Sequence, residues 1–175
     1  MKRLNATVQS AYIAQGEYAI GDKPEHLISA ILGSCVAVCL YDRVQGIGGM
    51  NHILLPDSAR SDMLTRSVGA GAMETLINAL LKAGSVRQNL DAKVFGGASV
   101  VAGLSDIGQR NAAFALDYLA TEGIPVISQS LGGAQARRIK FWPSSGRASQ
   151  KLVMPSEAPA PVVVETAKAN DLELF

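Results

Sequence analysis

The sequence predicts an α/β (α+β) fold, layered, with largely antiparallel strand pairing, and three observations indicate it. Extended apolar runs joined by short polar segments occur twice, and each such pair predicts a β-hairpin. Two further segments are predicted to be α-helices, one of them because its apolar residues repeat with a helical period. The helices do not alternate strictly with the strands, as they would in a parallel βαβ fold.

Two hairpins account for most of the predicted antiparallel pairing. The first joins a β-branched and apolar run over 35–41 to a second extended run over 47–55, through the polar segment 42–46. The second joins 137–142 to 147–154 around a Pro-Ser-Ser-Gly turn.

The predicted helices span 68–83 and 107–121. In the first, apolar residues recur at i, i+3, i+4, i+7 and i+8, which places them on one helix face. These residues are Met73, Leu76, Ile77, Leu80 and Leu81. Each helix is followed by a glycine, Gly84 or Gly123, which is a common residue just past a helix end.

Three shorter segments complete the predicted strands. Residues 1–20 contain short alternating apolar stretches that can add an edge strand, and 92–95 read as a short buried strand. Residues 124–127 form a further strand. Pro125 indicates the beginning of that strand or a sheet edge, because proline cannot donate to a ladder.

Length and composition indicate one globular domain. The chain has 175 residues, of which 48% are hydrophobic and 18% charged, and this balance is typical of a packed domain. We expect the domain to span 1–155. The composition then changes to Ser, Glu, Ala and Pro, and 156–175 is expected to be a flexible tail.

Charge and hydropathy exclude several classes of function. The formal net charge is +1 and no basic stripe with interleaved aromatic residues occurs, so we expect no nucleic-acid partner. No apolar run approaches the roughly 18 residues that span a bilayer, and the N-terminus lacks the apolar core of a secretory signal. We therefore expect no membrane insertion and a cytoplasmic location, where thiols stay reduced.

The chain has two cysteines and two histidines. In a strand, Cys35 and Cys39 would be separated by roughly 13 Å, which is too far for a disulfide. No Cys/His spacing predicts a metal site. We expect Cys39 to be a small buried hydrophobic residue and His26 to be a solvated surface residue.

The first hairpin can bring Cys35 next to His52. If its strands pair symmetrically about the Arg43–Val44 bond, these two residues lie opposite each other, with Cβ atoms roughly 5 Å apart. A slip of one residue would put them on opposite faces of the sheet. On hairpin symmetry alone, a catalytic pair and a buried structural cysteine are equally well supported.

A thiol beside an imidazole is the arrangement that a cysteine hydrolase needs. A free thiol has a pKa of about 8.5, and a neighbouring histidine can take its proton and return it to leaving ammonia. Gly33 and Ser34 allow a tight turn whose amide N–H groups can face a developing oxyanion. A third polar group should hold the imidazole or complete the site, and Ser29, Ser34 and Asn51 are close in sequence. Gly33, Ser34 and Asn51 are our candidates for stabilising the oxyanion or shaping the site.

The run Leu-Gly-Ser-Cys-Val-Ala-Val-Cys-Leu-Tyr-Asp over 32–42, followed by Gly-Gly-Met-Asn-His-Ile-Leu-Leu-Pro over 48–56, resembles the signature of the CheD family of chemoreceptor glutamine deamidases. The resemblance covers about residues 25–153 and continues through further motifs in the same order. These are Lys93–Ala98, Ile107–Asn111, Glu122–Val126, Leu131–Gly133, Arg138–Phe141 and Gly146–Arg147.

The resemblance implies that Cys35 is the nucleophile, His52 the general base and Ser29 the third member of a triad, at a position where the family commonly has threonine. It also implies that Gly96–Gly97 and Gly132–Gly133 form loops near the substrate, although a tight turn explains each glycine pair equally well. The implied fold is a layered α/β sandwich related to that of bacterial deamidating toxins, with no metal and no cofactor.

The implied reaction is the deamidation of specific glutamine side chains on chemoreceptors. The thiolate attacks the amide, ammonia leaves, and water hydrolyses the thioester to glutamate; glutamyl methyl esters can react through the same thioester. The implied partners are the cytoplasmic helical region of chemoreceptors and a CheC-type phosphatase. Two alternatives stay open: a chemotaxis binding module that regulates or is regulated by such a phosphatase, and a cysteine hydrolase of other specificity.

Overall fold

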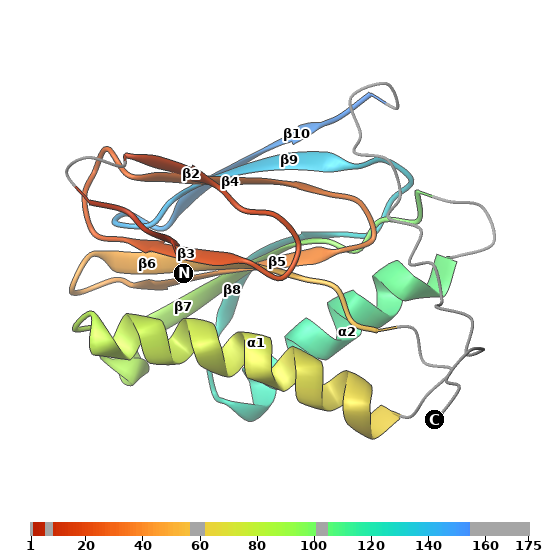
Figure 1. Ribbon diagram of the computed structural model, residues 1–175, viewed down its shortest axis with the longest axis horizontal. Helices are drawn as coiled ribbons and strands as arrows, with labels where there is room; N and C mark the ends of the chain where they lie inside the picture. The colour runs from red at the N-terminus through yellow and green to blue at the C-terminus, as the bar shows by residue number, and fades with distance from the viewer. Residues whose placement is uncertain (1, 6–8, 57–61, 101–104, 155–175) are drawn as a thin grey trace, which may run out of the picture.

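The computed structural model describes residues 2–5, 9–56, 62–100 and 105–154 and arranges them in three layers (Figure 1). Two helices form one outer layer, a six-stranded sheet forms the middle layer, and a four-stranded sheet forms the other outer layer. The predicted layered α+β fold is thus confirmed. Among the described residues, five of the eight strand pairings are antiparallel. The expected tail, 156–175, lies outside these residues.

The middle sheet has the strand order β1-β3-β6-β5-β7-β8. Its strands are β1 (Lys2–Arg3), β3 (Tyr18–Gly21), β5 (Val36–Asp42), β6 (Ile47–Ile53), β7 (Leu90–Gly96) and β8 (Val126–Leu131). The first predicted hairpin is confirmed as β5 and β6, and β5 also pairs antiparallel with β7. Because β5 is buried on both faces, its sequence is nearly continuously apolar.

The outer sheet has the order β10-β9-β4-β2. Its strands are β2 (Ser10–Tyr12), β4 (Leu27–Leu32), β9 (Arg137–Trp142) and β10 (Arg147–Leu152). The second predicted hairpin is confirmed as β9 and β10. The apolar pattern does not predict β4 as a strand of its own. Only three residues, 33–35, separate it from β5. Residues 1–20 were expected to give one edge strand; the structure has β1, β2 and most of β3 there.

The helices α1 (Asp62–Lys82) and α2 (Ser105–Thr121) pack on the face of the middle sheet that is turned away from the outer sheet (Figure 1). Both begin earlier than predicted. In α1, Met63, Leu64 and Val68 are 83%, 54% and 45% exposed, so the first turns carry no buried stripe from which a helical period could be read. No helix in the described ranges is long and apolar enough to cross a membrane.

Glycines follow both helices, as predicted. Gly84 and Gly123 have φ angles of 109° and 67°, which other residues rarely adopt. A short 3-10 helix, η2 (Arg87–Asn89), leads from α1 into β7. After α2, the strand β8 begins just past Pro125 rather than at residue 124, since proline has no N–H for the ladder.

Two apolar cores hold the layers together. The core between the helices and the middle sheet includes Val36, Val38 and Leu40, and the core between the two sheets includes Ala37 and Cys39. Successive side chains of a strand point to opposite faces, so β5 contributes to both cores. The cysteine is fully buried, as predicted, and burial raises the pKa of its thiol.

His26 is buried, which corrects the expectation of a solvated residue. Its side chain is 0% exposed, and Nδ1 accepts hydrogen bonds from the backbone N–H groups of Asp22 (3.1 Å) and Lys23 (3.2 Å). A Cβ at Gly21 would lie 2.8 Å from the same nitrogen. The chain therefore closes tightly over the ring, a tertiary arrangement that local polarity does not predict.

The register of the β5–β6 hairpin differs from the predicted one by two residues. Asp42 pairs with Ile47, so Ala37, and not Cys35, lies opposite His52. The predicted direct pairing is therefore wrong. A shift of two residues keeps every side chain on its predicted face, however, so Cys35 and His52 still belong to the same side of the sheet.

A four-residue turn, capped by the side chain of Asp42, goes with this register. The Asp42 Oδ1 accepts hydrogen bonds from the N–H groups of Val44 and Gln45, both at 2.8 Å. The Gly46 N–H donates to the Asp42 carbonyl at 3.0 Å, with a φ of 67° at the glycine. The turn therefore occupies 43–46, and Asp42 is the last residue of the ladder.

Candidate active site

Cys35 lies where the chain passes from the outer sheet to the middle sheet. β4 ends at Leu32 and β5 begins at Val36, so Gly33, Ser34 and Cys35 form the crossover. The thiol is half-buried and packs against the core between the sheets. Desolvation raises the pKa of the thiol to about 11, although a hydrogen bond from the residue's own backbone N–H acts to lower it. Such a thiol is neutral at pH 7 and needs a base to become a nucleophile.

The Gly96–Gly97 pair packs directly against the backbone of Cys35. Gly97 N–H donates to the Cys35 carbonyl at 2.8 Å, and Ala98 N–H donates to the Gly33 carbonyl at 2.9 Å. Gly96 has a φ of 115°, and a Cβ there would lie 2.2 Å from the Cys35 oxygen. Only glycine permits this approach.

The second glycine pair continues this layer. Gly132 N–H donates to the Gly96 carbonyl at 2.9 Å, and Ser99 N–H donates to the Gly133 carbonyl at 2.8 Å. Both glycine pairs thus lie beside the Cys35 segment, joined to it by backbone hydrogen bonds. Contact of these loops with a substrate stays a prediction.

A buried arginine fixes the second glycine loop. Arg137 is 4% exposed; its Nη1 donates to the carbonyl (2.7 Å) and hydroxyl (3.2 Å) of Ser130, and its Nη2 donates to the Gly132 carbonyl. Burial lowers the pKa of the guanidinium. Within the described ranges no carboxylate forms an ion pair with it. The positive charge of the guanidinium is therefore stabilised by hydrogen bonds to the loop and not by a carboxylate.

His52 lies in β6, and the segment 13–17 fixes both its backbone and its ring. Its N–H donates to the Glu17 carbonyl at 3.0 Å, and its carbonyl accepts the Gly16 N–H at 2.8 Å. In the ring, Nδ1 lies 3.3 Å from the Ile13 carbonyl oxygen. Because a carbonyl oxygen can only accept, this contact assigns the proton to Nδ1 and leaves the lone pair on Nε2.

The imidazole of His52 has the properties of a buried neutral base. The residue is 5% exposed, and Nε2 has no hydrogen-bond partner among the described residues. Desolvation lowers the pKa of the ring, while the Ile13 carbonyl and the charge of Glu17 act in the opposite direction. A neutral ring with an unpaired Nε2 is the form that can take a proton from a thiol.

Cys35 and His52 share one face of the sheet, with no hydrogen bond between their side chains. The histidine lies opposite Ala37, two residues along from Cys35, so the two candidate side chains are diagonal across the end of the ladder. No hydrogen bond joins the thiol to Nε2 in the described structure.

Ser29 is linked to His52 through a residue between them and not directly. Its hydroxyl lies 3.5 Å from the Ala11 carbonyl, while its backbone carbonyl accepts the Ile13 N–H at 2.9 Å. The Ile13 carbonyl in turn contacts the imidazole. Residue types do not reveal Ile13 as the group that orients the ring, because a backbone carbonyl leaves no mark on the sequence.

Asn51 lies on the other face of the middle sheet, which corrects its expected oxyanion or site-shaping role. It pairs with Val38, and its Oδ1 accepts the Val38 N–H at 3.1 Å. Its Nδ2 contacts the sulfur of Met73 in α1 at 3.5 Å. Neighbouring residues of a strand point to opposite faces, so Asn51 cannot share the face of His52.

Asn111 is a residue near the site whose chemistry the sequence did not single out. Its side chain bonds Ser34, 77 residues away, and Leu55, 56 residues away. Only the tertiary structure brings these groups together. The sequence offers two signals for it: the residue ends the Ile107–Asn111 motif of the family resemblance, and asparagine is unfavourable inside a helix.

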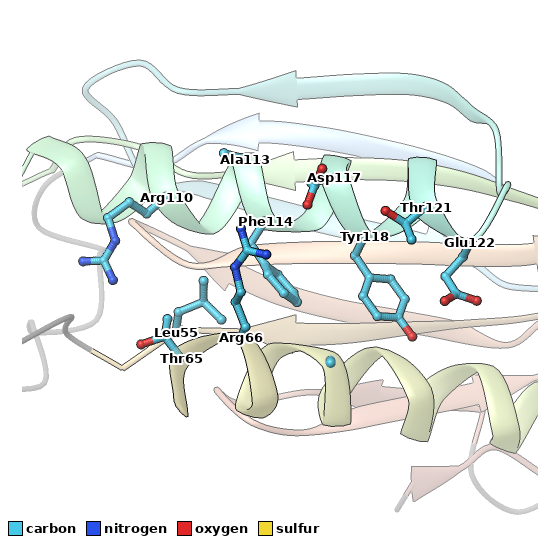
Figure 2. Close-up of a pocket in the computed structure, with 11 residues that line it drawn as sticks. Leu55, Thr65, Arg66, Arg110, Ala113, Phe114, Asp117, Tyr118, Thr121 and Glu122 are labelled. Atoms are coloured by element: carbon cyan, nitrogen blue, oxygen red, sulfur yellow. The ribbon is translucent and has the colours of Figure 1, made fainter. Parts of the chain in front are cut away.

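A groove of about 660 Å³ runs between α1 and α2, separate from this site. Figure 2 shows Arg110 toward one end of it and Glu122 toward the other, with Phe114 between them. Its lining includes neither a cysteine nor a histidine. We therefore assign the candidate active site to Cys35 and His52 and not to the groove.

A half-buried thiol and a buried neutral imidazole on one face of a layered α+β scaffold define a candidate cysteine hydrolase. Residues 54–152 match the family model described as CheD chemotactic sensory transduction. The chain belongs to the CheD family.

Curated relatives match nearly the whole chain. A probable chemoreceptor glutamine deamidase CheD from Caulobacter sp. (strain K31) is 51% identical over 94% of this chain and 92% of its own length. The protein of the same name from Agrobacterium fabrum is 47% identical over 98% of this chain and 99% of its own. Among solved structures, Neisseria meningitidis protein NMB0706 is 13% identical, with a TM-score of 0.43, covering 71% of this chain and 62% of that one.

Proposed function

We propose that the protein deamidates glutamine side chains on the cytoplasmic helical region of chemoreceptors, with Cys35 as nucleophile and His52 as general base. One observation carries the proposal. The Ile13 carbonyl holds Nδ1, so Nε2 is unprotonated, buried and on the face of the sheet that carries Cys35. The names of the relatives, which read chemoreceptor glutamine deamidase, support the substrate class.

The first step is proton transfer coupled to attack. Nε2 of His52 takes the thiol proton while the sulfur forms a bond to the carbon of the glutamine amide. The raised pKa of Cys35 keeps the resting thiol neutral, so the nucleophile forms only next to the base. Catalytic hydrogen bonds are often long in the free enzyme and tighten when substrate binds, which accommodates the diagonal placement of the pair.

The tetrahedral intermediate needs donors for its oxyanion, and the Cys35 N–H is suited to this role. This N–H points to the sulfur of the same residue, and no backbone carbonyl in the described ranges accepts a hydrogen bond from it. In a regular antiparallel pair, the Cys35 N–H would donate to the Gly97 carbonyl. That carbonyl instead lies against Gly108, where an added Cβ would be 2.5 Å from the oxygen. We propose the N–H groups of Gly33 and Ser34 as further donors.

Breakdown of the intermediate uses the same imidazole. The protonated Nε2 gives its proton to the amide nitrogen, the C–N bond breaks, ammonia leaves and a thioester remains. A water that loses a proton to Nε2 then adds to the thioester, and the C–S bond breaks to give glutamate and the free thiol. A glutamyl methyl ester would follow the same steps, with methanol in place of ammonia.

The remaining expected residues have supporting roles in this proposal. Ser29 acts on His52 through Ile13, whose N–H it accepts. The pairs Gly96–Gly97 and Gly132–Gly133 form a side-chain-free wall next to Cys35, which a receptor backbone can approach closely. A CheC-type phosphatase as a second partner is proposed from the family resemblance alone.

Mass spectrometry of a chemoreceptor cytoplasmic fragment tests the proposal. The fragment is incubated with wild type, Cys35→Ala and His52→Ala, and glutamine-to-glutamate conversion is followed site by site. We expect conversion by wild type only. Conversion by Cys35→Ala would contradict the thioester mechanism. An unchanged receptor with a reactive wild-type thiol would favour a hydrolase of other specificity, and an unreactive thiol a binding module.

A further inference from the structure

The ladder between β5 and β6 ends next to the candidate active site. Its last pair is Val36 opposite Ile53. Continuing the same register for two more residues would place Ser34 opposite Leu55, one residue before Cys35 and three residues after His52. In a continued ladder these two backbones would bond directly.

A side-chain amide stands between the two chains at that point. Asn111 Nδ2 donates to the Ser34 carbonyl at 2.8 Å, and its Oδ1 accepts the Leu55 N–H at 3.0 Å. The amide therefore satisfies the same acceptor and donor that a direct Leu55–Ser34 bond would have used. It lies between the two backbone segments, which do not pair directly beyond Val36 and Ile53.

Asn111 is itself held firmly. It is 1% exposed, and it lies less than one turn after Gly108 in α2. A Cβ at Gly108 would lie 2.5 Å from the Gly97 carbonyl oxygen and 2.7 Å from that of Ala98. The helix thus packs against the loop whose Gly97 N–H donates to the Cys35 carbonyl. Asn111 is therefore held in place relative to the segment that carries Cys35.

We propose that Asn111 is a positioning residue that sets the separation between the Cys35 thiol and the His52 imidazole. Its side-chain hydrogen bonds go to the backbones of Ser34 and Leu55 and to neither of the two catalytic side chains. It acts by holding the Ser34 and Leu55 backbones apart where the ladder stops. The catalytic roles of the two residues rest on the proposed function, but the geometric role of the amide can be tested without a receptor.

In the Asn111→Ala protein, we expect the Leu55 N–H to donate directly to the Ser34 carbonyl. The two backbone segments would then move closer together, and the Cys35 thiol would move with them. Asn111→Asp keeps an acceptor for the Leu55 N–H, but its carboxylate cannot donate to the Ser34 carbonyl. Because the Ser34 side carries the thiol, we expect both variants to be impaired.

Asp42→Ala is the matched control. Asp42 is 0% exposed and lies at the other end of β5, where its carboxylate accepts from the N–H groups of Val44, Gln45 and Val86. Like Asn111, it joins separate backbone segments through a buried side chain. Its loss weakens the turn over 43–46, while the buried faces of β5 and β6 keep the register of the ladder, and the crossover that carries Cys35 is not changed.

The experiment measures two quantities in folded wild type, Asn111→Ala, Asn111→Asp and Asp42→Ala: the rate of Cys35 alkylation by iodoacetamide, and kcat and KM on a receptor fragment. Urea unfolding of each protein reports the loss of stability. For the Asn111 variants we expect kcat to fall about tenfold to a hundredfold with KM within about threefold, since small misplacements of reacting groups act on that scale. The alkylation rate should change at least about fivefold, and Asp42→Ala should match wild type in both.

Three outcomes would overturn the inference. One is wild-type alkylation and kcat in folded Asn111→Ala. Another is an equal loss in Asp42→Ala at equal stability. The third is full activity of Asn111→Asp. If wild type itself leaves the receptor unchanged, the proposed function fails, while the alkylation comparison still decides the role of Asn111.

Discussion

Nδ1 of His52 lies 3.3 Å from the carbonyl oxygen of Ile13, and this contact decides which ring nitrogen can act as a base. The carbonyl accepts a hydrogen bond, so the proton sits on Nδ1 and the buried Nε2 carries the lone pair. In many hydrolases a carboxylate or amide side chain orients the histidine. Here a main-chain group of the segment 13–17 does so, and that segment also binds the histidine backbone.

The first prediction concerns the tautomers of the two histidines. His52 should be protonated on Nδ1, and His26 on Nε2, because the His26 Nδ1 accepts hydrogen bonds from Asp22 and Lys23. A long-range ¹H–¹⁵N spectrum at pH 8 distinguishes the two tautomers, and each ring serves as the control for the other. Identical patterns for both rings would contradict the assignment of Nε2 as the base.

The second prediction concerns pH. Burial lowers the pKa of His52 below the value of about 6.5 that an unfolded chain has. Between the two pKa values the unfolded state binds more protons, so the unfolding free energy is greatest above about pH 6.5 and falls as the pH drops through the native pKa. Urea unfolding of wild type and His52→Gln from pH 5 to 8 should show a smaller slope against pH in the variant. Equal slopes would mean that the ring titrates normally.

The third prediction concerns Gly96. An alanine there must keep a φ of 115° and would place its Cβ 2.2 Å from the Cys35 oxygen. We expect Gly96→Ala to cost about 3 kcal/mol or more, from backbone strain and overpacking together. Gly123→Ala is the control, because its φ is 67° and nothing lies within 4 Å of the added Cβ. It should cost about 1–2 kcal/mol, and urea unfolding that gives equal losses would show that contact with Cys35 contributes nothing.

The fourth prediction concerns Arg137. Its guanidinium reaches the carbonyls of Ser130 and Gly132, so Arg137→Ala leaves two half-buried acceptors without their charged donor, at a cost of about 1–3 kcal/mol. Arg138→Ala, one residue along on the exposed face of β9, should change stability by less than about 0.5 kcal/mol. Thermal or urea unfolding compares the two variants, and a neutral Arg137→Ala would mean that the loop does not depend on the guanidinium.

Several features of the fold could be read from sequence because they depend on local patterns. The strand β5 is continuously apolar and ends at a polar turn, the later part of α1 has a clear apolar stripe, and the glycines after both helices have the expected backbone. The early part of α1 has exposed apolar residues instead, so the apolar period predicts a start six residues later than Asp62.

The pairing of Cys35 with His52 shows where local reasoning stops. The face was predicted correctly because strand alternation depends only on whether the register shift is even or odd. The register itself goes with a four-residue turn over 43–46, which Asp42 caps, in place of the two-residue turn of the symmetric prediction, and this shifts the pairing by two residues. The contacts of Ile13 and Asn111 with the site join residues 39 to 77 positions apart, and no sequence pattern encodes them.

The last prediction separates two ways in which Ser29 can support His52. If its hydroxyl bonds the imidazole directly, as a triad member would, Ser29→Ala should lose about as much activity as His52→Ala. In the structure the hydroxyl lies 3.5 Å from the Ala11 carbonyl, and the link to the imidazole runs through the Ser29 carbonyl and Ile13, which alanine preserves. We therefore expect Ser29→Ala to lower kcat by less than about tenfold, against about a thousandfold or more for His52→Ala. Ser29→Thr is the matched comparison, because threonine keeps the hydroxyl group. Equal activity of the threonine and alanine variants on a receptor fragment would assign the support to the main chain, whereas a large loss confined to alanine would assign it to the hydroxyl.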